Sequence, residues 1–195
     1  FMYHIYHTEA FVIGHRNSGE ADRIFYLYTK DFGFVRAKAT GIRKLESKLR
    51  FSLQIFSHVY IDLVRGKDTW RITSGGSINY FSYISRNPIS LQIMAQISKL
   101  TQRLCAGEEA DPSIFADLID TANYLNKPNI AVAEQKSAEL TLVLRILHNL
   151  GYIGATDELS HYLHDEFDLS DVKYEELSKK TILFEINRAL KESQL

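Results

Sequence analysis

The sequence has one cysteine, three prolines, one tryptophan and no long hydrophobic run among its 195 residues. A single thiol, Cys105, excludes an internal disulfide bond and any zinc site built on two or more cysteines. No segment approaches the roughly 18 consecutive apolar residues that a membrane-spanning helix requires, and the N-terminus lacks a basic segment followed by an apolar one. We therefore expect a cytoplasmic protein, because a reducing compartment suits a lone thiol.

Motifs of the common enzyme classes are also missing. The chain has no phosphate-binding loop of the G-x-x-x-x-G-K-[ST] type, no G-x-S-x-G motif and no G-x-G-x-x-G fingerprint. His161, His164 and Asp165 are close enough to share one helical turn and bind a divalent ion, which leaves a metal-dependent hydrolase as one alternative. Further ligands at a characteristic spacing are missing, so surface histidines are the simpler interpretation. We expect no catalytic residues, no metal and no cofactor.

Charge is distributed unevenly along the chain. Hydrophobic residues make up 45% and charged residues 24% of the sequence, which is typical of a folded domain with a buried core. Residues 1–80 contain twelve Lys and Arg against seven Asp and Glu, a balance of +5, whereas residues 81–195 contain eleven against seventeen, a balance of −6. Two halves of opposite sign predict two modules with different partners.

Short alternating segments dominate the first half. Apolar and polar residues alternate with a period of two, and Gly, Asn and Asp separate the segments, which predicts five strands and a small barrel or sandwich. The turn Gly66-Lys67-Asp68 predicts a hairpin between the last two strands. Gly75-Gly76 predicts a bend or a bulge. The predicted strands cover residues 10–15, 24–29, 34–40, 56–64 and 69–73.

The pattern becomes helical after Tyr80. Asn87-Pro88 and Asp111-Pro112 each combine a capping side chain with a proline at the first helical position. A third helix is predicted at about 130–150 and ends at Gly151, and Ser170 would cap a last helix that turns Leu177, Leu183, Ile186 and Leu190 inward. We therefore predict two domains, a β-domain at 1–80 and a helical domain at 81–195.

The densest basic segment runs from Lys30 to Arg50. It contains seven basic and two acidic residues. In an extended strand Phe34, Arg36 and Lys38 share one face and leave the small apolar residues on the other. Residues 41–50 are predicted to be an irregular basic loop. A polyanion is the expected partner of such a surface. Trp70 is expected to point inward and Arg71 outward, beside Lys38. The candidate phosphate contacts are Arg36, Lys38, Arg43, Lys44, Lys48, Arg50, Arg65, Lys67 and Arg71.

Six short motifs follow one another within residues 19–68. They are G-E-A-D-R at 19–23, T-K-D-F-G at 29–33, G-I-R-K at 41–44, S-K-L-R at 47–50, L-Q-I-F at 53–56 and R-G-K-D at 65–68. In this order and spacing they resemble the bacterial recombination mediator family RecO, over about residues 3–75. A weaker similarity continues at 140–151. Within the first segment, Gly19 is expected to adopt a positive φ and Asp22 to form a local ion pair with Arg23.

The resemblance implies an N-terminal OB-fold barrel, a helical domain and a non-catalytic role in DNA repair on the nucleoid. It implies binding to single- and double-stranded DNA, annealing of complementary strands, and loading of RecA with RecR onto DNA coated by single-stranded DNA-binding protein. The family's basic loop falls on Arg43, Lys44, Lys48 and Arg50. Many members hold zinc with four cysteines after the L-G segment. Residues 151–167 have no cysteine, so this zinc site is not expected here.

Two further hypotheses concern contacts. Phe32 or Phe34 is a candidate for stacking on a base. The acidic C-terminal tail of single-stranded DNA-binding protein needs a basic pocket in the helical half, for which charge alone suggests Lys99, Arg103, Lys136 and Arg145. An OB-fold module that binds RNA remains an alternative, since it would present the same basic face.

Overall fold

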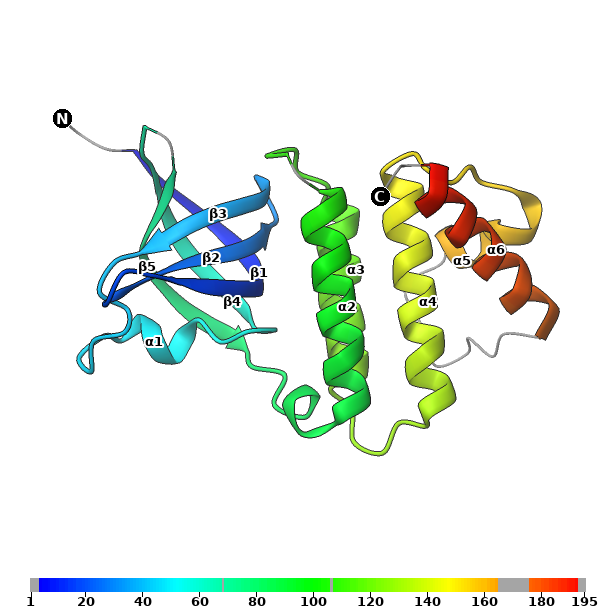
Figure 1. Ribbon diagram of the computed structural model, residues 1–195, viewed down its shortest axis with the longest axis horizontal. Helices are drawn as coiled ribbons and strands as arrows, with labels where there is room; N and C mark the ends of the chain where they lie inside the picture. Colours follow the sequence, from blue (N-terminus) through cyan, green and yellow to red (C-terminus); the bar gives the residue numbers. More distant parts are fainter. Residues whose placement is uncertain (1–3, 68, 106, 165–175, 193–195) are drawn as a thin grey trace. The chain divides into compact units, whose positions relative to one another are not determined.

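The computed structural model describes residues 4–67, 69–105, 107–164 and 176–192. The chain forms two compact units, drawn in Figure 1. The first consists of the residues up to Phe81 together with Cys105–Phe115, and the second of Ser82–Leu104 and the chain from Ala116 onward. Thus an eleven-residue segment beyond the last strand, Cys105–Phe115, packs with the β-unit.

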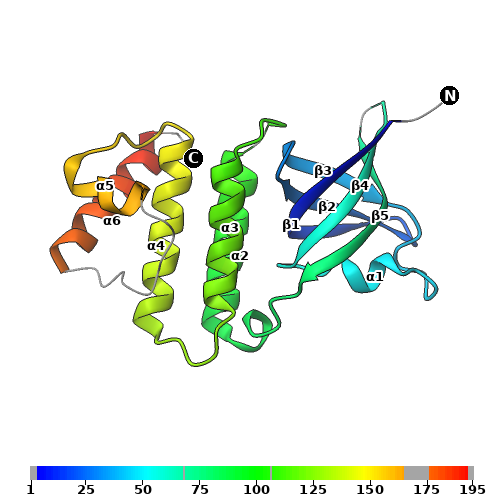
Figure 2. The same cartoon turned by 180° about the vertical axis from the view of Figure 1, so that it is seen from behind.

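The first unit is a closed barrel in which the strand order is β1-β2-β3-β5-β4. All neighbouring strands are antiparallel except β3 and β5, which are parallel. Figure 2 shows β1 beside β4, the pairing that closes the barrel. The strands are β1 (Ile5–Ser18), β2 (Asp22–Thr29), β3 (Gly33–Ala39), β4 (His58–Arg65) and β5 (Trp70–Asn79), and a short helix α1 (Leu49–Ser52) precedes β4.

Every second side chain of the strands points into the barrel and fills it, as the sequence predicts. In β3, Val35, Ala37 and Ala39 are almost fully buried, whereas Arg36 is exposed and Lys38 half-buried on the outer side. Small side chains at these inner positions suit the narrow interior of a five-stranded barrel. In β5, Trp70 points inward and the exposed Arg71 outward, as expected.

Two strands are longer than the sequence pattern indicates. β1 begins at Ile5 rather than residue 10, because the apolar Ile5 is exposed and the polar Thr8 is buried, so the start of the strand lacks the usual alternation. β5 continues to Asn79 through Gly75 and Gly76, where the sequence predicts a bend or bulge. The ring of Tyr60 covers Gly76 so closely that any Cβ there would collide with it. Glycine at this position therefore admits a neighbouring aromatic ring.

Cys105–Phe115 makes several contacts with the barrel. The backbone carbonyl of Glu109 lies against Gly33, which has φ +62°. The indole N–H of Trp70 donates a hydrogen bond to the Glu108 carboxylate at 2.9 Å. The rings of His58 and Phe115 meet edge to face, with centroids 5.8 Å apart. These contacts explain why the segment belongs to the barrel unit although helices flank it in sequence.

Asn87 and Asp111 begin helices in the way the sequence predicts. The Asn87 side-chain oxygen accepts hydrogen bonds from the amides of Ile89 and Ser90 at 3.0 and 3.2 Å. The Asp111 carboxylate accepts them from the amides of Ser113 and Ile114 at 2.8 and 3.2 Å. The helical elements are η1 (Ile84–Arg86), α2 (Pro88–Leu104), α3 (Pro112–Leu125), α4 (Val132–Asn149), α5 (Asp157–His164) and α6 (Glu176–Glu192).

The second unit is a helical bundle in which α2 and α4 lie side by side and run in the same direction (Figure 1). The Ser90 hydroxyl donates to the Gln135 amide oxygen at 3.0 Å, which joins the first turns of these helices. In α6, Ile182 is buried and Leu183 is 40% exposed, so the inward assignment of Leu183 is wrong. Both residues fit a helical period, and only packing selects the inner one. The predicted cap Ser170 lies outside the described residues.

Among the described residues, none of the helices combines the length and hydrophobicity required to cross a bilayer.

Gly33→Ala should destabilise the protein far more than Gly19→Ala. Both glycines have positive φ, +62° and +67°, which costs a residue with a Cβ roughly 1–2 kcal/mol. A Cβ at Gly19 meets nothing within 4 Å, whereas one at Gly33 collides with the Glu109 backbone and adds about 1–3 kcal/mol of overpacking. Chemical denaturation of both variants measures the difference. Equal losses of stability would show that Cys105–Phe115 does not pack against Gly33.

Cys105 should react with iodoacetamide only after unfolding. Burial, with a smaller effect from Asp111, raises the pKa of its thiol from 9.0 to about 11, and the thiolate is the reactive form. The neutral thiol is favoured in the folded state, so its contribution to stability is complete below about pH 9 and is lost as the pH rises toward 11. Mass spectrometry with and without denaturant tests the labelling. Rapid labelling of the native protein would contradict this placement.

Candidate nucleic-acid interface

A groove of about 520 Å³ on the barrel unit gathers cations and aromatic rings. Arg36 and Lys38 of β3 line it, together with Arg65 and Lys67 from the β4–β5 hairpin. Four of the nine basic residues singled out in the sequence therefore share one concavity. The remaining described lining residues are Arg16, Ile24, Tyr26, Phe34, Gly66, Thr69, Trp70 and Glu108.

Strand register explains the positive face. Arg16 of β1 pairs with Ile24 of β2, Ile24 with Lys38 of β3, and Lys38 with Arg71 of β5. Because directly paired residues point to the same side of a sheet, this row carries three cations across four strands. The predicted proximity of Arg71 to Lys38 is confirmed. Arg71 lies beside the groove and is not among the residues that line it.

Aromatic rings form part of the groove wall. Tyr26 and Phe34 stack with centroids 6.4 Å apart and planes 12° apart, and the Arg36 guanidinium lies 5.8 Å from the Phe34 centroid. Phe34 is only 5% exposed, and the half-buried Phe32 packs against Tyr6. A base would have to displace these neighbours before it could stack on either phenylalanine. The half-exposed Tyr26 is the better candidate for stacking.

Arg65, Trp70 and Glu108 form one part of the groove wall. The Arg65 guanidinium lies 5.2 Å from the Trp70 ring centroid and forms an ion pair with Glu108 at 3.0 Å. The Glu108 carboxylate also accepts the indole hydrogen bond. Trp70 is 3% exposed, which agrees with its expected place in the core.

The basic loop lies beside the first β-turn. The amide of Arg43 donates to the carbonyl of Ala21 at 2.9 Å, and its guanidinium donates to the carbonyl of Gly19 at 3.1 Å. Lys44 and Lys48 are exposed, and the Arg50 guanidinium lies 5.3 Å from the Phe51 ring centroid. The sequence predicts an irregular loop throughout, but α1 begins within it at Leu49. None of these four cations lines the groove.

Asp22 connects the loop to the groove. Its carboxylate forms an ion pair with Lys38 at 2.9 Å and accepts the Gly41 amide at 2.8 Å. The Lys38 hydrogen bond, followed by the Gly41 amide, lowers the pKa of Asp22 below its usual range. The expected ion pair between Asp22 and Arg23 is wrong. Neighbouring residues in β2 point to opposite faces, and Arg23 instead reaches Asn17 at 3.4 Å.

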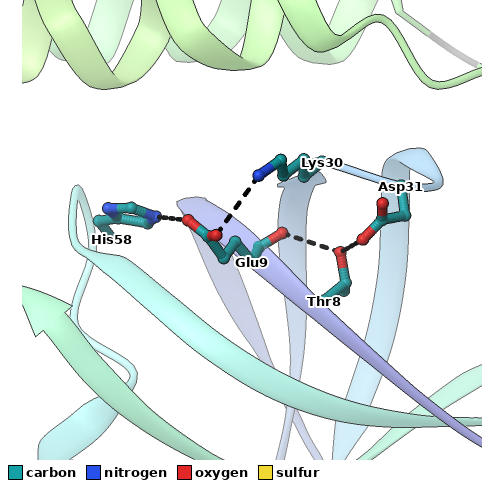
Figure 3. Close-up of polar contacts among 5 residues, drawn as sticks. All are labelled: Thr8, Glu9, Lys30, Asp31 and His58. Carbon is teal, nitrogen blue, oxygen red and sulfur yellow. Dashed lines mark hydrogen bonds and ion pairs between the residues drawn. The ribbon is translucent and has the colours of Figure 1, made fainter.

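Another part of the barrel is acidic. Glu9 accepts a hydrogen bond from His58 at 2.8 Å and lies 3.5 Å from Lys30, and the Thr8 hydroxyl donates to Asp31 at 2.6 Å (Figure 3). The concavity beside these residues is lined by three carboxylates and one lysine, so this surface is less favourable for a polyanion than the basic groove. The adjoining concavity, of about 380 Å³, is lined by His7, Thr8, Glu9, Lys30, Asp31, Tyr60, Ile61 and Asp62.

The four cations suggested for partner binding do not form one pocket. Arg145 is 8% exposed and binds Asp117 at 3.1 Å and the Tyr162 carbonyl at 2.8 Å, so it stabilises the bundle and is not a surface contact. Lys136 follows Gln135 on α4, and the Gln135 side chain accepts a hydrogen bond from Ser90 in the first turn of α2. Lys99 lies nine residues beyond Ser90, about 13 Å further along α2. Lys99 and the exposed Arg103 remain neighbours on the last turns of α2.

Asp165 and the side chain of His164 lie outside the described residues, and His161 is exposed on α5. Within the described part of the chain, no three His, Cys, Asp or Glu residues are grouped closely enough to hold a metal ion.

Arg16, Tyr26 and Glu108 are among the groove residues that sequence reasoning missed. Arg16 falls just outside the predicted first strand, which ends at residue 15, whereas β1 continues to Ser18. Tyr26 alternates with the buried Phe25 and Leu27, so the period of β2 was a usable signal for an outward ring.

The strand order and the closure of the sheet define an OB-fold domain, here with a basic groove on its surface. Residues 2–81 match the family described as "Recombination protein O N terminal". This region of the chain belongs to the RecO family, as its motifs indicated.

Relatives extend the similarity beyond the barrel. A DNA repair protein RecO from Dehalococcoides mccartyi is 33% identical over 141 residues, which cover 72% of this chain and 55% of the relative. A protein of the same name from Roseiflexus sp. is 28% identical over 155 residues, and one from Pelotomaculum thermopropionicum is 24% identical over 157. The chain spans between about half and three fifths of these curated relatives.

Proposed function

We propose that this chain is a non-catalytic DNA-binding protein of recombinational repair, which holds the phosphate backbone of DNA in the basic groove and along the loop cations. The observation that carries the proposal is the shared lining of one groove by Arg16, Arg36, Lys38, Arg65 and Lys67, with Tyr26 among them. Lys and Arg neutralise phosphates whatever the base sequence, and a half-exposed ring adds stacking.

Annealing follows from the same surface. Two complementary strands repel each other through their phosphates, and a cationic surface that holds both lowers the cost of their encounter. The groove carries cations from β1, β3 and the hairpin, and the loop adds four more. We assign single strands to the groove and the second strand or duplex DNA to the loop.

The names of the relatives support a repair role, and the remaining functions extend it. We propose that the protein works in the cytoplasm on nucleoid DNA, binds RecR, and helps to load RecA onto DNA coated by single-stranded DNA-binding protein. The helical unit would contact the acidic tail of the latter through Lys99 and Arg103, which are exposed on α2.

Arg36→Ala/Lys67→Ala should weaken binding of a labelled single-stranded oligonucleotide by about tenfold at low salt. The plot of log affinity against log salt should become shallower by roughly 0.7 for each phosphate that the variant no longer neutralises. Fluorescence anisotropy across a salt series measures both quantities. Lys179→Ala, an exposed lysine on α6, is the matched control and should bind as the parent does.

Arg43→Glu/Lys44→Glu tests the loop separately. We expect slower annealing of complementary strands and weaker duplex binding, with the larger effect at low salt. Unchanged affinity in both this variant and the groove variant would reject the whole interface. Competition with unlabelled RNA belongs in the same assay, since stronger competition by RNA than by DNA would favour the RNA-binding alternative.

Lys99→Glu/Arg103→Glu should abolish capture of a peptide with the acidic tail sequence of single-stranded DNA-binding protein, because reversed charges repel its carboxylates. Lys136→Glu should leave capture unchanged, since this lysine lies near the start of α4, far from the last turns of α2, and already forms an ion pair with Glu139 at 3.0 Å. A pulldown at physiological salt distinguishes the two. If the double variant still captures the peptide, the tail binds at a site other than Lys99 and Arg103.

A further inference from the structure

Glu108 enters the basic groove from outside the barrel strands. Its segment packs with the barrel unit, and the Glu108 carboxylate reaches the part of the groove that Arg65 and Trp70 line. One oxygen, Oε2, lies 3.0 Å from Nη2 of Arg65, and the other, Oε1, accepts the Trp70 Nε1–H at 2.9 Å. Both oxygens are therefore fixed by donors that line the candidate DNA site.

The two donors suit a phosphate as well as a carboxylate. A guanidinium and a neutral N–H held side by side present donors to two oxygens of one anion, an arrangement in which arginine binds carboxylate and phosphate alike. Stacking on Trp70 holds the Arg65 guanidinium in place, with 5.2 Å between it and the ring centroid. The donor pair is thus preorganised, and Glu108 occupies it.

We propose that Glu108 is a built-in competitor that occupies one phosphate subsite of the groove and thereby selects for long polyanions. The inference rests on the proposed DNA-binding function. A strand that also engages Arg36, Lys38 and Lys67 displaces the carboxylate because it binds at several points at once. A mononucleotide binds at too few points to do so.

The geometry allows the carboxylate to leave while the backbone stays. The Glu109 carbonyl lies against Gly33, which anchors the segment next to Glu108. The Glu108 side chain is 43% exposed and that of Arg65 61%, so their ion pair lies in the solvent-screened range in which such pairs are weak. A rotation of one side chain therefore opens the subsite.

Glu108→Gln tests the proposal, because it removes the charge and retains an oxygen that can accept the Trp70 hydrogen bond. Trp70 is the only tryptophan in the chain, so its fluorescence reports directly on this subsite. The variant should bind a labelled single-stranded oligonucleotide about fivefold more tightly at low salt, and this increase should shrink as salt rises. It should also bind tripolyphosphate at lower concentrations than the parent, as followed by Trp70 emission.

Glu109→Gln is the matched control. Glu109 carries the same charge one residue further on, is exposed, and does not line the groove. Equal increases in affinity in Glu108→Gln and Glu109→Gln would overturn the proposal, because only net charge would then matter. In Glu108→Gln/Arg65→Ala the increase should disappear, and its retention would exclude Arg65 as the phosphate donor.

The two readouts separate this inference from the proposed function. Suppose that neither protein binds the oligonucleotide while Glu108→Gln still binds tripolyphosphate more tightly than the parent. The proposed DNA-binding function is then rejected, and the phosphate subsite occupied by Glu108 is supported. If the oligonucleotide binds through Arg36 and Lys67 but Glu108→Gln changes neither readout, the function stands and the inference falls.

Discussion

The alternation of β3 between its two neighbours is the constraint on which the rest of the barrel unit depends. Val35, Ala37 and Ala39 are buried in the interior, and this fixes Arg36 and Lys38 outside, since a slip of one residue would bury both charges. Pairing with β2 and β5 then sets Tyr26 and Arg71 beside them. The cationic groove is in this sense a consequence of how the core is filled.

A second feature of the structure is the opposition between cations and carboxylates on the barrel. Asp22 restrains Lys38 and fixes the start of the loop through Gly41, while Glu108 holds Arg65 against Trp70. Each carboxylate orders a cation and at the same time neutralises it locally. The surface is therefore more structured, and less uniformly positive, than its composition indicates. The acidic surface around Glu9 limits where a polyanion can lie.

Several features of the fold could be predicted from local chemistry. Asn87 and Asp111 marked two helix starts, because a capping side chain acts on amides only two or three residues away. The outward position of Arg71 followed from the period of a strand. The length of β1, the inner residue of α6 and the partner of Asp22 did not follow, since each depends on residues distant in sequence: Leu183 and Ile182 fit a helical period equally well.

The sequence by itself determined a β-domain followed by helices, the core faces of the strands, and a surplus of charge on one segment, because periodicity and charge are local properties. Tertiary structure alone decided that the cations divide between a groove and a loop, that Arg145 is buried against Asp117, and that a helix-flanked segment belongs to the barrel unit. Only folding brings Glu108 within 3.0 Å of Arg65, 43 positions earlier in the chain, because no local pattern encodes a contact between such distant residues.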